Sequence, residues 1–158
     1  MFLKWRRKTP VSRLTEGRKA VVKGEVVAAD TVALPITGTR CVFYDLVVEV
    51  YKKGPRGRGR PLWMPLNAER RCTGFFVDDG DGRVWVEANP DAIIITNGYH
   101  EAGEVPRHEF RRFSAWMLTE KSKVIVRGVV SKSGKREPAE SMVLRADEQK
   151  VIEILVCK

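Results

Sequence analysis

The chain has few of the residues that build metal centres and disulfide scaffolds. Its 158 residues include only three cysteines and two histidines. No Cys-x-x-Cys pair occurs, and Cys41, Cys72 and Cys157 cannot all pair within one chain. Neither a zinc ribbon nor a disulfide framework is therefore supported, and we expect reduced thiols that pack as small apolar groups.

Long apolar runs are also absent. Runs such as residues 92–95 and 154–157 reach only four residues, whereas a helix needs about 18–20 apolar residues to span a bilayer. Residues 1–10 lack the apolar segment of a signal peptide. We therefore expect a soluble, cytoplasmic protein.

What the chain does contain is typical of one globular domain. Hydrophobic residues make up 43% of it and aromatic residues 8%, and its length suits a single core. The domain is expected over residues 18–158, after a basic N-terminal arm over residues 1–17. Pro10 discourages a long helix within that arm.

The positive charge is concentrated in two segments. Residues 1–23 hold eight basic and one acidic residue, and residues 52–60 hold five basic and no acidic residue. The net charge of the whole chain is only +9, so the remainder carries −3. A polyanion should therefore meet the arm and the 52–60 loop first.

Alternating apolar and polar residues predict mostly strands. Residues 41–52 place five apolar side chains on one face of a strand: Val42, Tyr44, Leu46, Val48 and Val50. Asp45 and Glu49 then lie on the other face. Further strands are expected over residues 19–29, 31–34, 69–77, 83–87, 124–132, 142–145 and 151–156. The glycine-rich segment 54–60 is expected to be a flexible loop tip.

One segment favours a helix. Phe110, Phe113 and Met117 follow helical spacing within residues 101–119. Many short strands with one short helix predict a mainly β, single-domain fold. We expect a closed or partly open OB-like β-barrel, because closure removes exposed strand edges.

Four sequence pieces occur in an order that resembles a known domain. They are a Gly24-x-Val26 strand, the Pro35–Tyr44 segment (PITGTRCVFY), the Phe75–Val86 hairpin (FFVDDGDGRVWV) and a late strand with Val124, Val126 and Gly128. Over about residues 20–130 the chain resembles the GIDE domain, also called the BAM (beside-a-membrane) domain. That family occurs in mitochondrial outer-membrane E3 ubiquitin ligases and in prokaryotic membrane-associated proteins.

The resemblance implies a recognition or scaffold module rather than an enzyme. In the ligases, activity belongs to a RING finger that needs about eight Cys and His ligands, and this chain has five such residues in all. We therefore expect no ubiquitin transfer. The transmembrane helices that usually flank the domain are not expected either.

Other candidate chemistry is weak. The Asp78–Gly82 cluster reads as a hairpin turn, because it lacks the distal Glu of a calcium loop. His100 and His108 lack metal-ligand spacing and are expected on surface loops. Cys41 begins a strand without a supporting base and is expected to be a packed thiol. We predict no catalytic residues, no metal site and no cofactor.

Three kinds of partner remain. The first is a protein docked on exposed anchors, because aromatic and arginine side chains supply most interface energy. The second is nucleic acid, held by the basic loop and arm, although no single strand interleaves enough aromatic and basic residues to form a stacking platform. The third is an anionic membrane, contacted by residues 1–16. The candidate binding residues are Arg56, Arg58, Arg60, Trp63, Trp5, Arg6 and Arg7. Trp85 is expected in the core and Trp63 on the surface.

Overall fold

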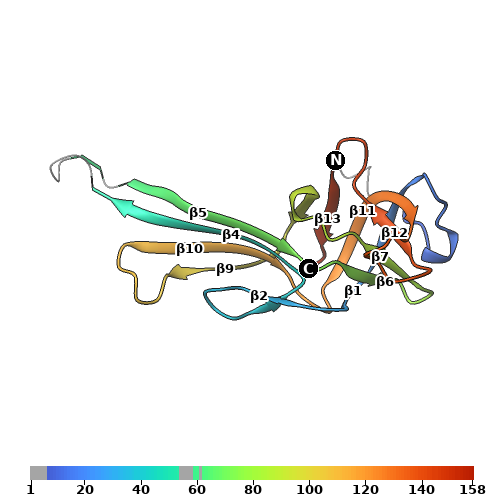
Figure 1. Cartoon of the computed structure of the whole chain (residues 1–158), viewed down its shortest axis with the longest axis horizontal. Coiled ribbons are helices and arrows are strands. Elements are labelled where there is room, and N and C mark those ends of the chain that lie inside the picture. The colour runs from blue at the N-terminus through green and yellow to red at the C-terminus, as the bar shows by residue number, and fades with distance from the viewer. Residues whose placement is uncertain (1–6, 54–58, 61) are drawn as a thin grey trace.

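A computed structural model describes residues 7–53, 59–60 and 62–158. Within these residues it has thirteen strands and two three-residue 3-10 helices, η2 (Val11–Arg13) and η4 (Pro90–Ala92). No helix of the described part is long and apolar enough to cross a membrane. The chain forms a closed barrel from which a second sheet projects (Figure 1).

Five strands close the barrel. They are β1 (Lys19–Ala28), β6 (Phe75–Asp78), β7 (Arg83–Val86), β12 (Met142–Arg145) and β11 (Lys123–Lys132). Each pairs with the next in that order, and β11 pairs back with β1. The β7–β12 pair is parallel and the other four are antiparallel. Two more strands, β13 (Ile152–Val156) and β8 (Ile93–Thr96), extend the sheet from β11.

Close approach of strands explains two glycines of the barrel. A Cβ atom at Gly24 in β1 would collide with the backbone of Asp78 in β6, and one at Gly128 in β11 would lie 2.7 Å from the carbonyl oxygen of Arg145 in β12. The barrel is filled by seventeen buried apolar side chains, among them Phe43, Phe75, Val126 and Ile154. This interior is the main core of the molecule.

The projecting sheet has four antiparallel strands. They are β5 (Leu62–Cys72), β4 (Phe43–Lys52), β10 (Arg111–Leu118) and β9 (Tyr99–Glu104), in that spatial order. Its base is anchored in the barrel, because Phe43 and Leu118 belong to the barrel core. A short hairpin, β2 (Val32–Ala33) and β3 (Arg40–Cys41), packs beside that base and contributes Leu34 to a second apolar cluster.

The N-terminal segment from Thr9 onwards lies along the barrel. The backbone N–H of Thr9 donates to the carbonyl oxygen of Val21, and that of Gly17 donates to the carbonyl oxygen of Val130. Both hydrogen bonds are 2.8 Å long. Val11 and Leu14 pack against the barrel core. These contacts hold residues 9–17 to β1 and β11.

The mainly β, single-domain barrel predicted from the sequence is confirmed. So is the 75–86 hairpin, in which β6 and β7 pair along their whole length. The alternation predicted for residues 41–52 holds from Phe43 onwards, since Tyr44 and Leu46 are buried while Asp45 and Glu49 share the opposite face. At Val42 the prediction is wrong, because the strand is interrupted there and Val42 packs in the barrel core instead.

The helix predicted over residues 101–119 is wrong. That segment forms the end of β9, a turn and all of β10. Phe113, Ala115 and Met117 are buried on one face of β10, which is the period of a strand. Pairing with β4 and β9 overrides the helical spacing of the aromatic residues.

Candidate functional site

Strand register divides the projecting sheet into two faces, because directly opposed residues of antiparallel strands point to the same side. One face carries the rings of Tyr51, Trp63, Phe110 and Trp116, and we call it the aromatic face. Its members are Asp45, Val47, Glu49, Tyr51, Trp63, Pro65, Ala68, Arg70, His100, Ala102, Glu104, Phe110, Arg112, Ser114 and Trp116.

Three aromatic rings form a row near the far end of this face. Trp63 and Tyr51 are opposed across β5 and β4, with ring centroids 5.2 Å apart in an edge-to-face arrangement. Tyr51 stacks on Phe110 at 6.1 Å. The guanidinium of Arg112 lies over the Trp63 ring at 4.2 Å. The row therefore joins β5, β4 and the turn before β10, and it ends in a cation–π contact.

A second aromatic group lies nearer the barrel. The rings of His100 and Trp116 stack 4.2 Å apart across β9 and β10. The Nε2 atom of His100 is 2.7 Å from the hydroxyl oxygen of Ser114. Although its ring is stacked, Trp116 remains 47% exposed. An exposed indole held in a fixed position is a preformed anchor for a partner.

The charges of the aromatic face are nearly balanced. Arg112 donates to Glu49 over 3.0 Å, and Arg70 approaches Asp45 at 3.5 Å. Glu104 is opposite Arg112 on the neighbouring strand. A surface whose arginines already face carboxylates offers little net attraction for a polyanion.

Phe110 is held in an unusual conformation. Its φ angle is 62°, in the left-handed region that bulky residues rarely adopt. Its side chain is nevertheless 62% exposed. A left-handed backbone and an exposed ring both fail to stabilise the fold. We therefore infer that Phe110 is exposed in order to bind a partner.

An open groove of about 640 Å³ lies beside the aromatic row. Tyr51, Trp63 and Phe110 form its aromatic wall, and its polar rim is made by Lys53, Glu104, His108, Glu109 and Arg111. Both signs of charge meet in this groove. Because the groove is open rather than enclosed, it would leave much of a small ligand in water, whereas its mixed lining can contact side chains of a partner.

The opposite face of the sheet is covered near the barrel. Leu34 of the β2–β3 hairpin packs there with Tyr44, Leu46 and Phe113. The hydroxyl of Thr39 also donates to Glu101 over 2.6 Å. Among the described residues the hairpin covers only this opposite face, so the aromatic face is the more exposed side of the sheet.

The structure places only some of the predicted binding residues. Trp63 lies in β5 and is half-buried within the aromatic row, whereas Arg60 and Arg7 are exposed. Arg56, Arg58, Trp5 and Arg6 lie outside the described residues. Trp85 is 7% exposed, as predicted for a core residue.

The acidic cluster of residues 78–82 forms the turn of the β6–β7 hairpin. Asp78 accepts from the N–H of Gly80, and Asp79 accepts from those of Asp81 and Gly82. The other oxygen of Asp79 accepts from Val11, which ties the N-terminal segment to the turn. Among the residues that the structure describes, no group of three or more His, Cys, Asp and Glu side chains is arranged to hold a metal ion.

Cys41 is a packed thiol. It is fully buried, and burial together with the nearby Glu101 raises its pKa to about 11. Burial likewise raises the pKa of Cys72 to about 11. Both thiols are therefore protonated at neutral pH and poor nucleophiles.

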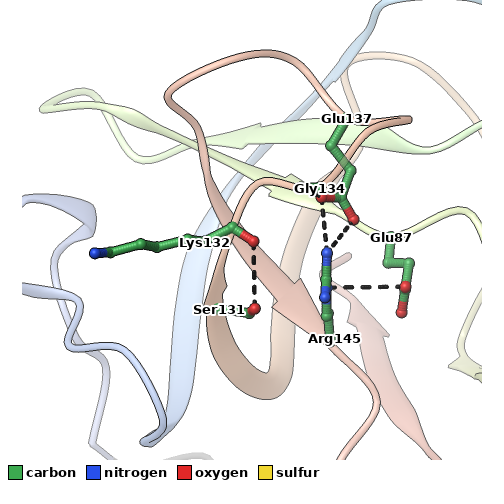
Figure 2. A network of polar contacts seen from close by, with 6 residues as sticks. All are labelled: Glu87, Ser131, Lys132, Gly134, Glu137 and Arg145. Carbon is green, nitrogen blue, oxygen red and sulfur yellow. Dashed lines mark hydrogen bonds and ion pairs between the residues drawn. The ribbon is translucent and has the colours of Figure 1, made fainter.

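A polar cluster at one end of the barrel has a structural role. Figure 2 shows Arg145 of β12 between Glu137 and Glu87. Its Nη2 atom donates to both carboxylate oxygens of Glu137, over 2.6 and 2.8 Å, and Glu137 also accepts from the N–H of Gly134. This cluster holds the loop between β11 and β12 on the barrel.

Sequence reasoning missed most of the aromatic face: Tyr51, His100, Phe110, Arg112 and Trp116. Because residues 101–119 were predicted to be a helix, the pairing of β10 with β4 and β9 was not expected. The strand period of Phe113, Ala115 and Met117 could have revealed it. The row itself could not be found along any one strand, because its rings come from three segments.

Comparisons with protein-family models, with curated proteins and with solved structures found no match to this chain.

Proposed function

We propose that the protein is a non-catalytic interaction module that docks a protein partner on the aromatic face of its projecting sheet. The observation that supports this best is an exposed sheet face on which tryptophan, tyrosine and arginine side chains are fixed by one another. These residue types dominate interface hot spots. The balanced charge of the face suits a protein better than a polyanion.

The aromatic face also offers anchors at two separated points. It spans four strands about 4.8 Å apart, and anchors lie at both its ends, Trp63 at the far end and Trp116 near the barrel. A partner that reached both tryptophans would contact β5, β4 and β10 together. Binding should therefore depend on two separated tryptophans rather than one.

The test is affinity capture with the wild-type chain and three variants. Trp63→Ala and Trp116→Ala should each weaken capture of the same partner by about tenfold or more. Ile94→Ala is the matched control, because Ile94 is 52% exposed but lies on β8 of the other sheet. Equal capture by all four proteins would contradict the proposal.

A second candidate is single-stranded nucleic acid bound at the far end of the same face. The row of Trp63, Tyr51 and Phe110 supplies aromatic surface for base stacking, and Lys53 and Arg111 line the adjacent groove. Anisotropy titrations of mixed-sequence oligonucleotides at about 50 and 200 mM salt test it, since several phosphate contacts should weaken steeply between them.

We further propose that the domain is of the GIDE type with an OB-like barrel and that it works in the cytoplasm close to a membrane. The order of its motifs supports this, from the Pro35–Tyr44 segment to the Phe75–Val86 hairpin. An experimental structure compared strand by strand with GIDE domains would test it. A different strand order in the barrel would remove the assignment.

A further inference from the structure

The far half of β5 exposes a continuous apolar run. Leu62, Met64 and Leu66 are 63%, 45% and 48% exposed, and Trp63 and Pro65 lie between them. Three of the seven large hydrophobic side chains exposed in the described part of the chain belong to this segment. We call residues 62–66 the apolar edge, because β5 is the outer strand of the projecting sheet.

The apolar edge is poorly suited to pairing with another strand. Pro65 has no N–H to donate. The register with β4 shifts between Val48 and Glu49, which leaves Leu66 as an extra residue in β5. Proline and a bulge are the usual means by which an edge strand avoids strand addition. A second copy or an extended peptide added along this edge would therefore lack part of its backbone hydrogen bonds.

Apolar side chains leave the edge on both sides of the sheet. Met64 is opposite Val50 on the face that the β2–β3 hairpin covers nearer the barrel. Trp63 is opposite Tyr51 on the aromatic face. A folded partner packed on one face of the sheet would cover the apolar side chains of β5 on that face only. A fluid lipid interface can surround an edge and cover the side chains on both faces.

The charge around the apolar edge is positive. The described residues between 50 and 66 include three basic side chains and no acidic one, namely Lys52, Lys53 and Arg60, and all three are exposed. The neighbouring β9–β10 turn is balanced, with Glu104 and Glu109 beside Arg107 and Arg111. Basic residues next to exposed apolar ones fit an anionic lipid surface.

We propose that the apolar edge of β5 inserts into the surface of an anionic membrane, with Lys52, Lys53 and Arg60 at the lipid head groups. The sheet then stands on its β5 edge, and the barrel lies to one side because the sheet projects away from it (Figure 1). This proposal does not rest on protein docking on the aromatic face, although Trp63 belongs to both surfaces. It also places the membrane contact on the sheet rather than on residues 1–16.

The test is co-sedimentation with two kinds of vesicle, phosphatidylcholine alone and phosphatidylcholine with about 30% phosphatidylserine. The wild-type chain should bind the anionic vesicles at least about tenfold more tightly than the neutral ones, and added salt should weaken binding. Absence of binding to the anionic vesicles would overturn the proposal.

The variant that tests the site is Leu62→Thr, Met64→Thr and Leu66→Thr combined, because threonine keeps the preference for a strand. It should lose about tenfold or more in vesicle affinity. The matched control is Ile94→Thr with Tyr99→Thr, two side chains of similar exposure outside the apolar edge. Equal loss in the control variant would contradict the assignment.

Two further variants keep the test decisive. Lys52→Glu with Lys53→Glu changes only exposed side chains, so the fold should survive while binding to anionic vesicles is lost. Replacement of Phe2, Leu3 and Trp5 by serine tests the arm. Loss of binding in that variant alone would move the contact to the arm and overturn the proposal.

Sedimentation velocity of the lipid-free protein is the remaining measurement. A monomer supports the proposal. A dimer that the threonine variant abolishes would show that a second copy covers the edge, and would contradict it.

Discussion

Aromatic side chains are buried in the barrel core but exposed on the aromatic face of the projecting sheet, whose other face buries Tyr44 and Phe113. In the barrel, Phe43 and Phe75 are buried in the core. In the sheet, Phe110 and Trp116 remain largely exposed and contact mainly other side chains of the same surface. The same residue type therefore stabilises the fold in the barrel core and is presented to solvent on the aromatic face.

This difference assigns separate tasks to the two regions. Burial of apolar surface is the dominant favourable term in folding, so the barrel interior should supply most of the stability. The projecting sheet has a smaller cluster of seven buried residues, five from one of its faces and two from the β2–β3 hairpin. Substitutions on its other face should change binding while leaving the fold intact. Four predictions test how complete this separation is.

The largest effect is expected from Phe75→Ala. Phe75 is fully buried in the barrel, and its truncation should lower the free energy of unfolding by about 3–5 kcal/mol. Phe110→Ala, the same change on the aromatic face, should cost less than about 1 kcal/mol, because the ring is already in water. Denaturant unfolding of both variants measures this. Similar losses would mean that the two regions do not differ in their contribution to stability.

Leu34→Ala tests whether the sheet has a core of its own. Leu34 is fully buried between the β2–β3 hairpin and the sheet, so its truncation should cost about 2–4 kcal/mol. Amide hydrogen exchange should accelerate in β4 and β10 more than in β11. Uniform acceleration over the whole chain would instead show that the sheet and barrel unfold as one unit.

The Arg145 cluster should contribute less. Glu137→Gln keeps the size of a side chain that is 8% exposed but removes its charge, and should cost about 1–2 kcal/mol of stability. Lys132→Gln is the control, because its pair with Glu16 is 3.6 Å long and exposed, and should cost less than about 0.5 kcal/mol. Thermal unfolding of the two variants gives the comparison. A larger loss in the control would argue against the cluster as an anchor for its loop.

The smallest effect is expected at Asp79. Partial burial acts to raise its pKa, but N–H donors from Val11, Gly82 and Asp81 outweigh that effect and hold the pKa below its usual value. Its contribution to stability is therefore present above the pKa of the unfolded chain, near 3.9, and is lost as pH falls through the lower folded value. Asp79→Ala should cost about 1 kcal/mol at pH 7. At pH 2–3 the difference in unfolding free energy between Asp79→Ala and wild type should shrink. A difference that stays constant with pH would contradict a stabilising role for the Asp79 carboxylate.

Much of the barrel could be predicted from local patterns. Alternation in residues 19–29 and 124–132 was sufficient to find β1 and β11, and the turn residues between Phe75 and Val86 were sufficient to find the β6–β7 hairpin. These signals are local, because strand period and turn chemistry depend on neighbouring residues. The projecting sheet was harder, since Phe110, Phe113 and Met117 fit a helix until β10 pairs with β4 and β9.

The candidate site depends on contacts that no local pattern contains. Trp63 was singled out because it follows a glycine-rich loop, and it does belong to the aromatic row. Its neighbours Tyr51 and Phe110 are twelve and forty-seven residues away in the chain. Only the pairing of β4 with β5 and with the start of β10 brings the three rings together, and that pairing joins segments far apart in the chain.

The measurement that tests the central proposal most directly is site-specific photo-crosslinking to the captured partner. A photoreactive side chain at Ala68 or Ala102 lies on the aromatic face, and one at Ala139 lies in the loop at the end of the barrel; all three positions are exposed. We predict crosslinks from Ala68 and Ala102 and none from Ala139. Crosslinks from Ala139 alone would contradict the assignment of the projecting sheet as the docking surface.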